Sequence, residues 1–515
     1  MASTSSAVSH EISGAEFHSR SALHDHGSVE AAGDPKAVNS STFEIPKDPG
    51  DYLDHGLRRG LKGRHFVLIA LGSIIGPGKC FDPVVPLHAD DMAQVPSMDW
   101  DMHCTSLVLL ASSSALVLLC VGEVTTMFPV HGGFIEHANR FVDPALSFSL
   151  SWLYYLMWSI YLASDWNAAY IILQYWVPAD KMPQWAWYLI MWAVFNVLTT
   201  LGVTVYGELE YIFGMFKFLS LIVLFFISIL ANVGAFGGGY VGFRYWTPPT
   251  GPLVDGINGF GQVFVLAATY YVGTEVISLA AGESKNPQRD VPALAGWKSA
   301  GNFVNAIIII AGISANNGVV YVQSRTLYTM ALTGKAPAFF KATTSRGVPW
   351  RAILFSNLWG WLALMNMSVK AGAVFTYFNS VGGTAAYFTW IIIMLTFLRV
   401  RAGLAAQGVD LKTLPFKAAG SIWIYRLTFL FFIFLLFIQG WTVFKHPFNW
   451  KSFIASYITI PTFFTLYFGY KWYHDTRWLR ASEIPLADRN VRDESVEEAK
   501  HGVPWRRKAW RLFKD

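Results

Sequence analysis

The stretch YIFGMFKFLSLIVLFFISILANV, residues 211–233, decides the class of fold. It carries a single charged residue, Lys217, in a run that is otherwise apolar or small and polar. A helix crosses the hydrocarbon of a membrane with about 20 apolar residues, whereas a barrel strand needs about 10 residues of alternating polarity. Length and unbroken hydrophobicity therefore predict a membrane-spanning α-helix.

Ten further stretches of the same character lie on both sides of this one. They are residues 65–78 (short), 104–121, 145–175, 185–205, 263–281, 303–330, 352–369, 373–398, 423–444 and 453–470. Only 14% of the 515 residues are charged and 53% are hydrophobic, while soluble domains are about 25% charged. We therefore expect an all-α polytopic membrane protein with about 11 spans, and the lipid bilayer as its surroundings.

Charge and cysteine content exclude several classes of function. A net charge of +5 is small for this length and does not favour a nucleic-acid partner. Cys80, Cys104 and Cys120 show neither paired spacing nor a metal-ligand pattern. The sequence contains no Walker loop, metal cluster or catalytic triad, so we expect neither an enzyme nor an ATP-driven pump, and no cofactor.

Polar tails flank the membrane domain, which covers residues 57–470. Residues 1–56 have no apolar core, and we expect a disordered cytosolic tail rather than a cleaved signal peptide. Residues 471–515 are charged and predict a second cytosolic tail. Lysine and arginine in short loops mark the cytosolic side, and four of them follow the first tail: Arg58, Arg59, Lys62 and Arg64.

The same charge rule reveals a missing crossing. Cytosolic-type charges lie both before and after the predicted span 303–330. They are Lys285, Arg289 and Lys298 on one side, and Lys335, Lys341, Arg346 and Arg351 on the other. One helix cannot have both ends inside, and only about a dozen residues, between Val291 and Phe303, are available for the missing crossing.

A second anomaly is the segment 79–103, which carries five aspartates and three prolines. Each aspartate at mid-membrane costs a few kcal/mol on insertion scales. The segment is therefore not half of an ordinary span. It is typical of sequence from another register or of an unspliced intron, and a true extracellular loop is the competing interpretation.

Four motifs occur in order along the chain. They are LRRGLKGRHFVLIALGSIIGPG (57–78), GEVTTMFPVHGGFIEHANRFVDPALSF (122–148), YYVGTEVISLAAGESKNPQRDVP (270–292) and SANNGVVYVQSRTLY (314–328). Each resembles the corresponding segment of fungal amino acid permeases of the amino acid–polyamine–organocation superfamily. One motif alone is weak, but four in family order make the resemblance specific.

The resemblance implies a 5+5 inverted-repeat (LeuT-like) transporter core with broken first and sixth helices. Repeat one would cover about 57–233, repeat two about 263–398, and two extra helices 423–470. Family members have twelve spans, cytosolic termini and a place in the plasma membrane. Here the family's seventh span is missing between Pro292 and Gly301, and segment 79–103 replaces parts of the first two spans.

The resemblance further implies proton-coupled uptake of amino acids by alternating access. A zwitterion held in a membrane needs free N–H groups for its carboxylate and free carbonyls for its ammonium, which broken helices provide. The first break is residues 72–78, and we expect Ile74, Gly76 and Gly78 to bind substrate. Pro77 stands where the family usually has Thr or Ser, and proline has no N–H to donate.

The second break lies in the predicted sixth span. The resemblance implies that Tyr271, Gly273 and Thr274 offer backbone carbonyls to the substrate amino group. Glu275 is an ionisable residue within an apolar run, which makes it a candidate for proton coupling. A structural, hydrogen-bonded carboxyl is the alternative for Glu275.

Two more charges fall inside predicted spans. Asp165 occurs where relatives often carry Glu on the third span, and it is a candidate for contact with substrate or proton; lining a polar cavity is the alternative. Lys217 matches a lysine on the fifth span of many relatives, where it takes the place of a sodium ion and favours proton coupling. The alternative to a coupling role is that the Lys217 side chain extends toward the membrane interface.

Alternatives for the whole chain remain open. The same fold serves non-transporting nutrient sensors, and a missing helix is also expected of an inactive product of a mis-spliced transcript or faulty gene model. Polyamines, choline and γ-aminobutyrate are alternative substrates.

Overall fold

The computed structural model describes residues 100–130, 132–174, 176–178, 180–233, 240, 300–367, 371–444 and 448–487. All of them belong to the contact unit that comprises residues 48–515. The expected substrate residues Ile74, Gly76, Gly78, Tyr271, Gly273 and Thr274, and the proton candidate Glu275, lie outside the described residues.

The described residues form helices joined by turns, with no β-strand among them. The α-helices are α3 (Trp100–Met127), α4 (Gly133–Phe141), α5 (Pro144–Leu173), α6 (Gln184–Thr200), α7 (Val203–Asn232), α10 (Ala300–Leu332), α11 (Trp350–Leu358), α12 (Ala371–Ala406), α13 (Ile422–Ile438), α14 (Trp450–Tyr457) and α15 (Thr459–His474). Short 3-10 helices are η4 (Ala338–Lys341), η5 (Trp359–Met367), η6 (Leu411–Thr413), η7 (Trp441–Phe444) and η8 (Ala481–Glu483). The all-α prediction is confirmed for this part of the chain.

Helix boundaries depart from the predicted ranges where the backbone is broken. Gly202 has φ 109°, a conformation that favours glycine, and α6 ends at Thr200. Residues 203–205, from the end of the predicted span 185–205, and residues 206–210, predicted as a loop, both belong to α7. The predicted span 352–369 is an α-helix followed by a 3-10 helix, α11 and η5. Trp100–His103, at the end of the anomalous segment 79–103, form the first turn of α3.

Long apolar helices are the structural mark of membrane spans. By length and composition, Ser380–Ala406 within α12 qualifies by itself among the described residues. Two bent pairs raise the number to as many as three: Gln184–Thr200 with Val205–Lys217 (118°), and Trp450–Tyr457 with Thr459–His474 (43°). The described part of the chain thus accounts for one to three crossings by this criterion.

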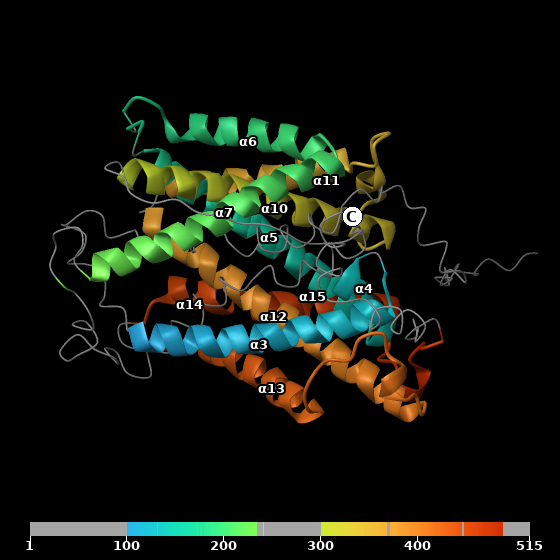
Figure 1. Cartoon of the computed structure of the whole chain (residues 1–515). Helices are drawn as coiled ribbons and strands as arrows, with labels where there is room; N and C mark the ends of the chain where they lie inside the picture. Colours follow the sequence, from blue (N-terminus) through green and yellow to red (C-terminus); the bar gives the residue numbers. More distant parts are fainter. Residues whose placement is uncertain are drawn as a thin grey trace, which may run out of the picture. The chain divides into compact units, whose positions relative to one another are not determined.

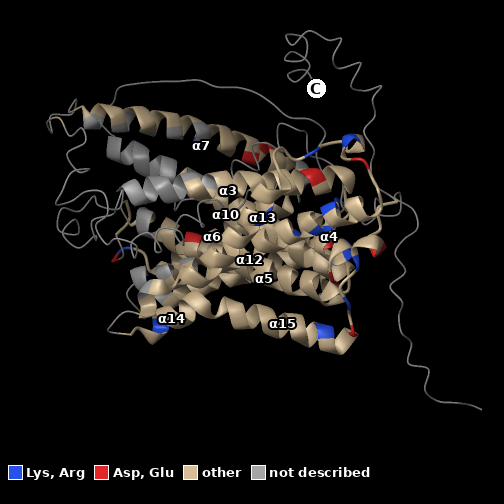
Figure 2. Cartoon of the chain, turned by 90° about the horizontal axis from the view of Figure 1, so that it is seen from below, with Lys and Arg blue, Asp and Glu red and all other residues tan. Residues whose placement is uncertain are grey.

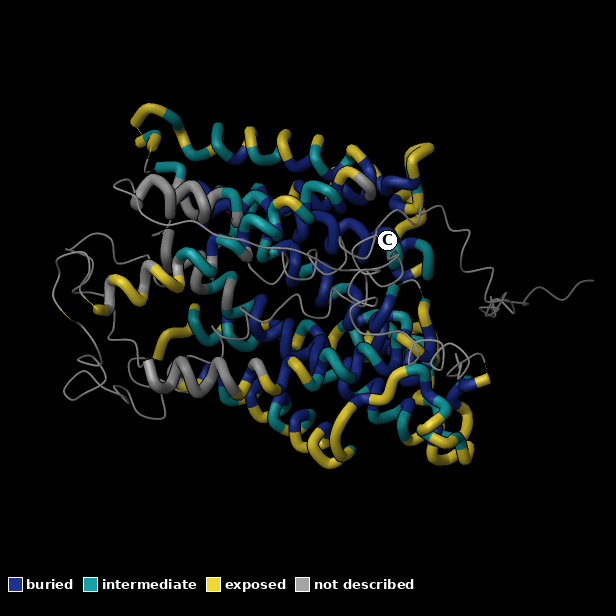
Figure 3. The backbone as a smooth tube through the Cα atoms, viewed as in Figure 1, coloured by how far each residue is buried: buried dark blue, intermediate teal, exposed yellow. Residues whose placement is uncertain are grey.

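Helix α5 lies at the centre of the bundle. It packs against α10, α12, α15, α4 and η5 (Figure 1). Its buried serines Ser149, Ser151 and Ser159 donate to backbone carbonyls four residues earlier, at 2.6–3.0 Å, so their hydroxyls are paired without water. Buried residues concentrate on α5, α10 and α12 (Figure 3).

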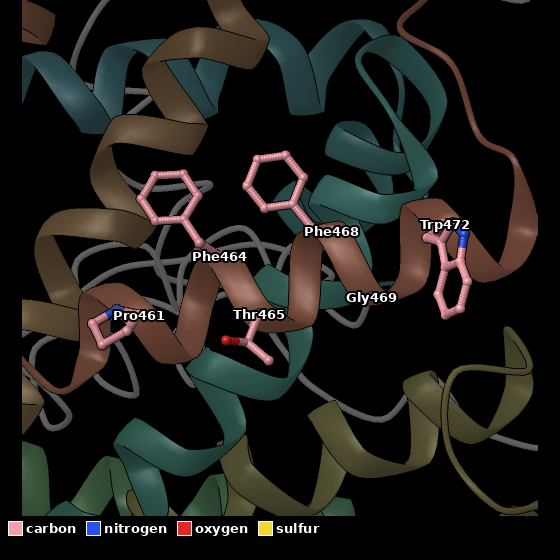
Figure 4. Close-up of a pocket in the computed structure, with 6 residues that line it drawn as sticks. All are labelled: Pro461, Phe464, Thr465, Phe468, Gly469 and Trp472. Atoms are coloured by element: carbon pink, nitrogen blue, oxygen red, sulfur yellow. The ribbon is translucent and has the colours of Figure 1, made fainter.

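The outer helices expose apolar side chains. On α13, Leu427, Leu430 and Phe437 are each about 60% exposed, although the opposite side of the helix is buried. A shallow apolar groove runs along α15, where Phe464, Phe468 and Trp472 point away from the helix (Figure 4). Charged residues instead gather near α4 and the end of α15 (Figure 2). A helix that is apolar on all sides is buried in protein or lipid, so this pattern suits a bilayer.

Candidate functional site

A buried ion pair on α7 is the centre of the candidate site. The Lys217 Nζ lies 4.0 Å from the Glu210 Oε1, and both side chains are fully buried. Seven residues make about two helical turns, which brings the two side chains to the same face of α7. Each charge would be costly in the membrane by itself, and the pairing offsets part of that cost.

Helix α10 supplies the polar partners of Glu210. The Ser314 hydroxyl donates to Glu210 Oε1 at 2.7 Å across 104 residues of sequence. The buried Asn317, one turn further along α10, lies beside the same carboxylate. Both residues belong to the SANN motif, so that motif has a role in the contact between α10 and α7.

Asp165 on α5 joins this pair. Its carboxylate interacts electrostatically with the Lys217 ammonium. Three helices, α5, α7 and α10, therefore bring together two carboxylates and one ammonium. Asp165, Glu210 and Lys217, with Ser314 and Asn317, are called the charge cluster below.

One end of the charge cluster is closed by aromatic rings. Tyr206, one turn before Glu210 on α7, stacks on Tyr321 of α10 with centroids 4.2 Å apart and an interplanar angle of 5°. The Arg325 guanidinium lies over the Tyr321 ring, 5.0 Å from its centroid.

The sequence analysis named Asp165 and Lys217, and the structure places their charges near each other. It missed Glu210, because the predicted span began at residue 211 and left GELE in a loop. The observed α7 begins at Val203, so Lys217 is in mid-helix and 1% exposed. A carboxylate seven residues before an intramembrane lysine was the available signal.

Two further ion pairs, Arg401–Glu123 and Lys471–Asp143, connect the ends of helices near α4 and the end of α15. Buried Glu123 of α3 accepts hydrogen bonds from Arg401 Nε (2.5 Å) and Nη2 (2.6 Å) of α12 and from the Ala418 N–H (2.7 Å). Asp143, just before α5, accepts from Lys471 Nζ of α15 at 2.6 Å. The glutamate of the GEVTTMFP motif therefore joins α3 to α12 and to the loop that follows it.

Within the described ranges, no three His, Cys, Asp or Glu side chains are grouped so that they could hold a metal ion. The charge cluster itself offers an ion pair and hydrogen bonds. It can hold a cation or a proton between three helices.

Comparison with known proteins decides the family. Residues 65–295 and 293–482 match the family described as amino acid permease. The chain belongs to this family. An uncharacterised amino-acid permease of Schizosaccharomyces pombe is 31% identical over 90% of this chain and 94% of its own length. A general amino acid permease of Saccharomyces cerevisiae is 33% identical over 84% of this chain and 85% of its own.

Among solved structures, a manganese transporter of Eremococcus coleocola superposes with a TM-score of 0.39 at 13% identity, over 84% of this chain and 97% of that one. A likeness of that size carries no argument. Family membership itself makes this permease an integral membrane protein of amino acid transport, not an enzyme, as the sequence predicted.

The family match also bears on the interrupted region of this permease. Its two pieces meet at residues 293–295, inside the interval where the charge pattern predicts a missing crossing. The alignment with the S. pombe relative runs over 525 positions but takes in 90% of the 515 residues, about 464. The difference leaves roughly 60 aligned positions opposite gaps in this chain.

Proposed function

We propose that this permease imports amino acids across the plasma membrane together with protons, by alternating access. The observation that carries the proposal is the charge cluster. A buried Lys217 paired with Glu210, beside Asp165, lies among α5, α7 and α10. Intramembrane ionisable groups are expensive and mark ion or proton pathways, and ion coupling needs such a group.

The substrate is proposed to bind at the two glycine-rich breaks, at Ile74, Gly76, Gly78, Tyr271, Gly273 and Thr274. Glu275 and Lys217 are the proposed coupling residues. This assignment follows the inverted-repeat architecture, with both termini cytosolic, and rests on the family motifs 57–78 and 270–292. The S. cerevisiae relative's name, general amino acid permease, favours a broad range of amino acids.

Uptake of a radiolabelled amino-acid mixture into permease-deficient cells that express this chain tests the proposal. Surface expression is quantified in parallel, and each assay is repeated with a proton uncoupler. We expect uptake that the uncoupler abolishes. Uptake that the uncoupler leaves unchanged would remove proton coupling from the proposal.

An inactive copy of a permease is the second candidate function. The two-piece family match and the gaps relative to the S. pombe permease favour it, because a bundle that lacks one helix of an inverted repeat loses part of its packing. Surface-expressed chain without any uptake, in the same assay, would support this candidate and contradict transport.

A further inference from the structure

A buried carboxylate near the end of α3 is held by three hydrogen bonds. Glu123 is 0% exposed and accepts from Arg401 Nε at 2.5 Å and from Arg401 Nη2 at 2.6 Å. Its Oε2 also accepts from the Ala418 N–H at 2.7 Å. The planar guanidinium contacts both carboxylate oxygens, a geometry that is stronger and more specific than a single contact. The three donors together fix the position of the carboxylate.

The contact joins three segments that are far apart in the sequence. Glu123 belongs to α3, Arg401 to α12, and Ala418 to the loop between η6 and α13. Helix α3 packs against α12 (Figure 1). The loop lies against α3 at the preceding residue as well, because a Cβ atom on Gly122 would be 3.3 Å from the Phe416 Cε1 atom. One carboxylate therefore keeps the end of α3 against both α12 and this loop.

The pair lies at the end of the bundle that the charge rule assigns to the cytosol. Lys412 and Lys417 lie in the loop that follows α12, and Arg140 lies in α4, which follows α3. The Arg401 side chain is 13% exposed, whereas the Glu123 side chain is 0% exposed. Water therefore reaches the edge of the pair and can solvate both charged groups if the two helices separate.

A contact of this kind suits a junction that must open and close. A buried ion pair adds little net stability compared with packed apolar side chains, because each charge loses its hydration. Separation returns that hydration, whereas separated apolar side chains would expose their surface to water at a cost. The closed and the open junction are therefore closer in free energy than they would be for an apolar contact.

We propose that Glu123 and Arg401 form a reversible latch at the cytosolic end of the permease. The latch holds α3 against α12 while the substrate path is closed toward the cytosol, and it separates when the path opens. Helix α3 is the first described helix after the proposed substrate-binding break 72–78, so the chain connects it to that break. Both residues are positioning residues for transport. The inference deepens the proposed function and rests on its alternating access.

Cys120 reports on the state of the latch. It is a free cysteine, 0% exposed, and lies three residues before Glu123 on α3, so both side chains share one face of the helix. Cys80 and Cys104 are the other cysteines of the chain and are replaced by serine for the measurement. The rate at which a charged maleimide modifies Cys120 is then measured in inside-out membrane vesicles, with and without a saturating amino-acid mixture.

We expect the amino-acid mixture to change the modification rate of Cys120 at least threefold, because substrate shifts the permease between states with a closed and an open latch. A rate that is the same with and without amino acid overturns the proposal, since a permanent structural contact gives that result. This arm leaves Glu123 and Arg401 unsubstituted, so it does not depend on the folding of a latch variant.

Substitution of Arg401 provides the second arm. Arg401→Met removes the guanidinium from Glu123, so Cys120 should react at least tenfold faster, and its rate should no longer depend on amino acid. Arg401→Lys keeps a charged donor and should restore that dependence. Arg399, two residues earlier on α12, donates to the Leu479 carbonyl instead, so Arg399→Met is the matched control and should keep the rate within twofold. Equal Cys120 rates in Arg401→Met and in its parent chain overturn the latch.

Uptake of radiolabelled amino acid, measured in cells that express the same chains, separates this inference from the proposed function. Uptake together with a constant Cys120 rate contradicts the latch and leaves transport intact. An amino-acid-dependent Cys120 rate without uptake contradicts transport, although the latch opens and closes as proposed. A constant rate without uptake contradicts both.

Discussion

At the scale of single residues, buried charged groups have partners that lie far away in the sequence as well as on the same helix. Lys217 pairs with Glu210 on the same helix, and Glu210 in turn pairs with Ser314, which is 104 residues away in sequence. Glu123 pairs with Arg401 across 278 residues. Local sequence shows that an ionisable residue lies in an apolar run, but the partner that makes its burial tolerable is decided by helix packing.

His137 provides a pH-dependent test at this scale. It lies on α4, a short helix between two predicted spans, and its Nε2–H donates to the Phe128 carbonyl at 2.8 Å. Its pKa is lowered from 6.5 to about 4, chiefly by burial; the hydrogen bond to the Phe128 carbonyl opposes the shift, and the nearby Arg140 adds to it. The folded protein therefore keeps His137 neutral over a range in which the unfolded chain protonates it.

The sign follows from this difference in bound protons. Between pH 6.5 and 4 the unfolded state binds more protons, so His137 removes stability as the pH falls, by about 3 kcal/mol in full. Thermal unfolding in detergent should show that His137→Gln loses less stability than the unsubstituted protein from pH 7 to pH 4. Equal losses in both proteins would mean that His137 is not buried as a neutral base.

At the scale of elements, the segment that follows α15 packs against the bundle. The Leu479 N–H donates to the Val142 carbonyl at 3.1 Å. Gln407, the residue directly after α12, donates from its Nε2 to the Ile484 carbonyl at 2.7 Å. Ile484 and Leu486 are 2% and 1% exposed. Residues 475–487 therefore join the ends of α4 and α12, although their composition predicts a polar tail.

Gly403 on α12 tests this contact. A Cβ atom there would lie 3.0 Å from Ile484 Cδ1 and 3.3 Å from the Ala481 carbonyl oxygen, so Gly403→Leu should displace residues 475–487. We expect faster tryptic cleavage at Arg477 and Arg480, measured on the detergent-purified protein. Gly469→Leu on α15, where nothing lies within 4 Å of the added Cβ, is the matched control. Unchanged cleavage in Gly403→Leu would show that the segment does not depend on this packing.

At the scale of the whole molecule, the interruption near residues 293–295 is the feature with the largest expected effect. A span needs about 20 residues, and the gaps relative to the S. pombe permease amount to roughly 60 positions. The charge pattern and the family match independently place an interruption in the same interval.

Restoring a crossing tests the consequence. Insertion of the relative's seventh span and following loop between Pro292 and Ala300 should raise amino-acid uptake per surface molecule at least fivefold, because the second repeat regains its first helix. An equally long Gly/Ser insertion, which cannot cross the membrane, serves as the control. If the unaltered chain transports as well as the restored one, the missing span is dispensable.

The sequence by itself determined the class of the protein, its family and two members of the charge cluster. Hydrophobic length is a local property, so helices such as α5 and α10 are predicted within a few residues. The ordered motifs indicate the family, and Asp165 and Lys217 stand out because charges are rare in apolar runs.

Only the tertiary structure decided what those charges contact. Glu210 looked like a loop residue because GELE is polar, and Gly202, not hydrophobicity, sets where α7 begins. Likewise the composition of residues 475–487 gives no sign of their packing on α12. Burial and pairing depend on which helices are neighbours in space, and that depends on contacts between residues more than a hundred positions apart in the chain.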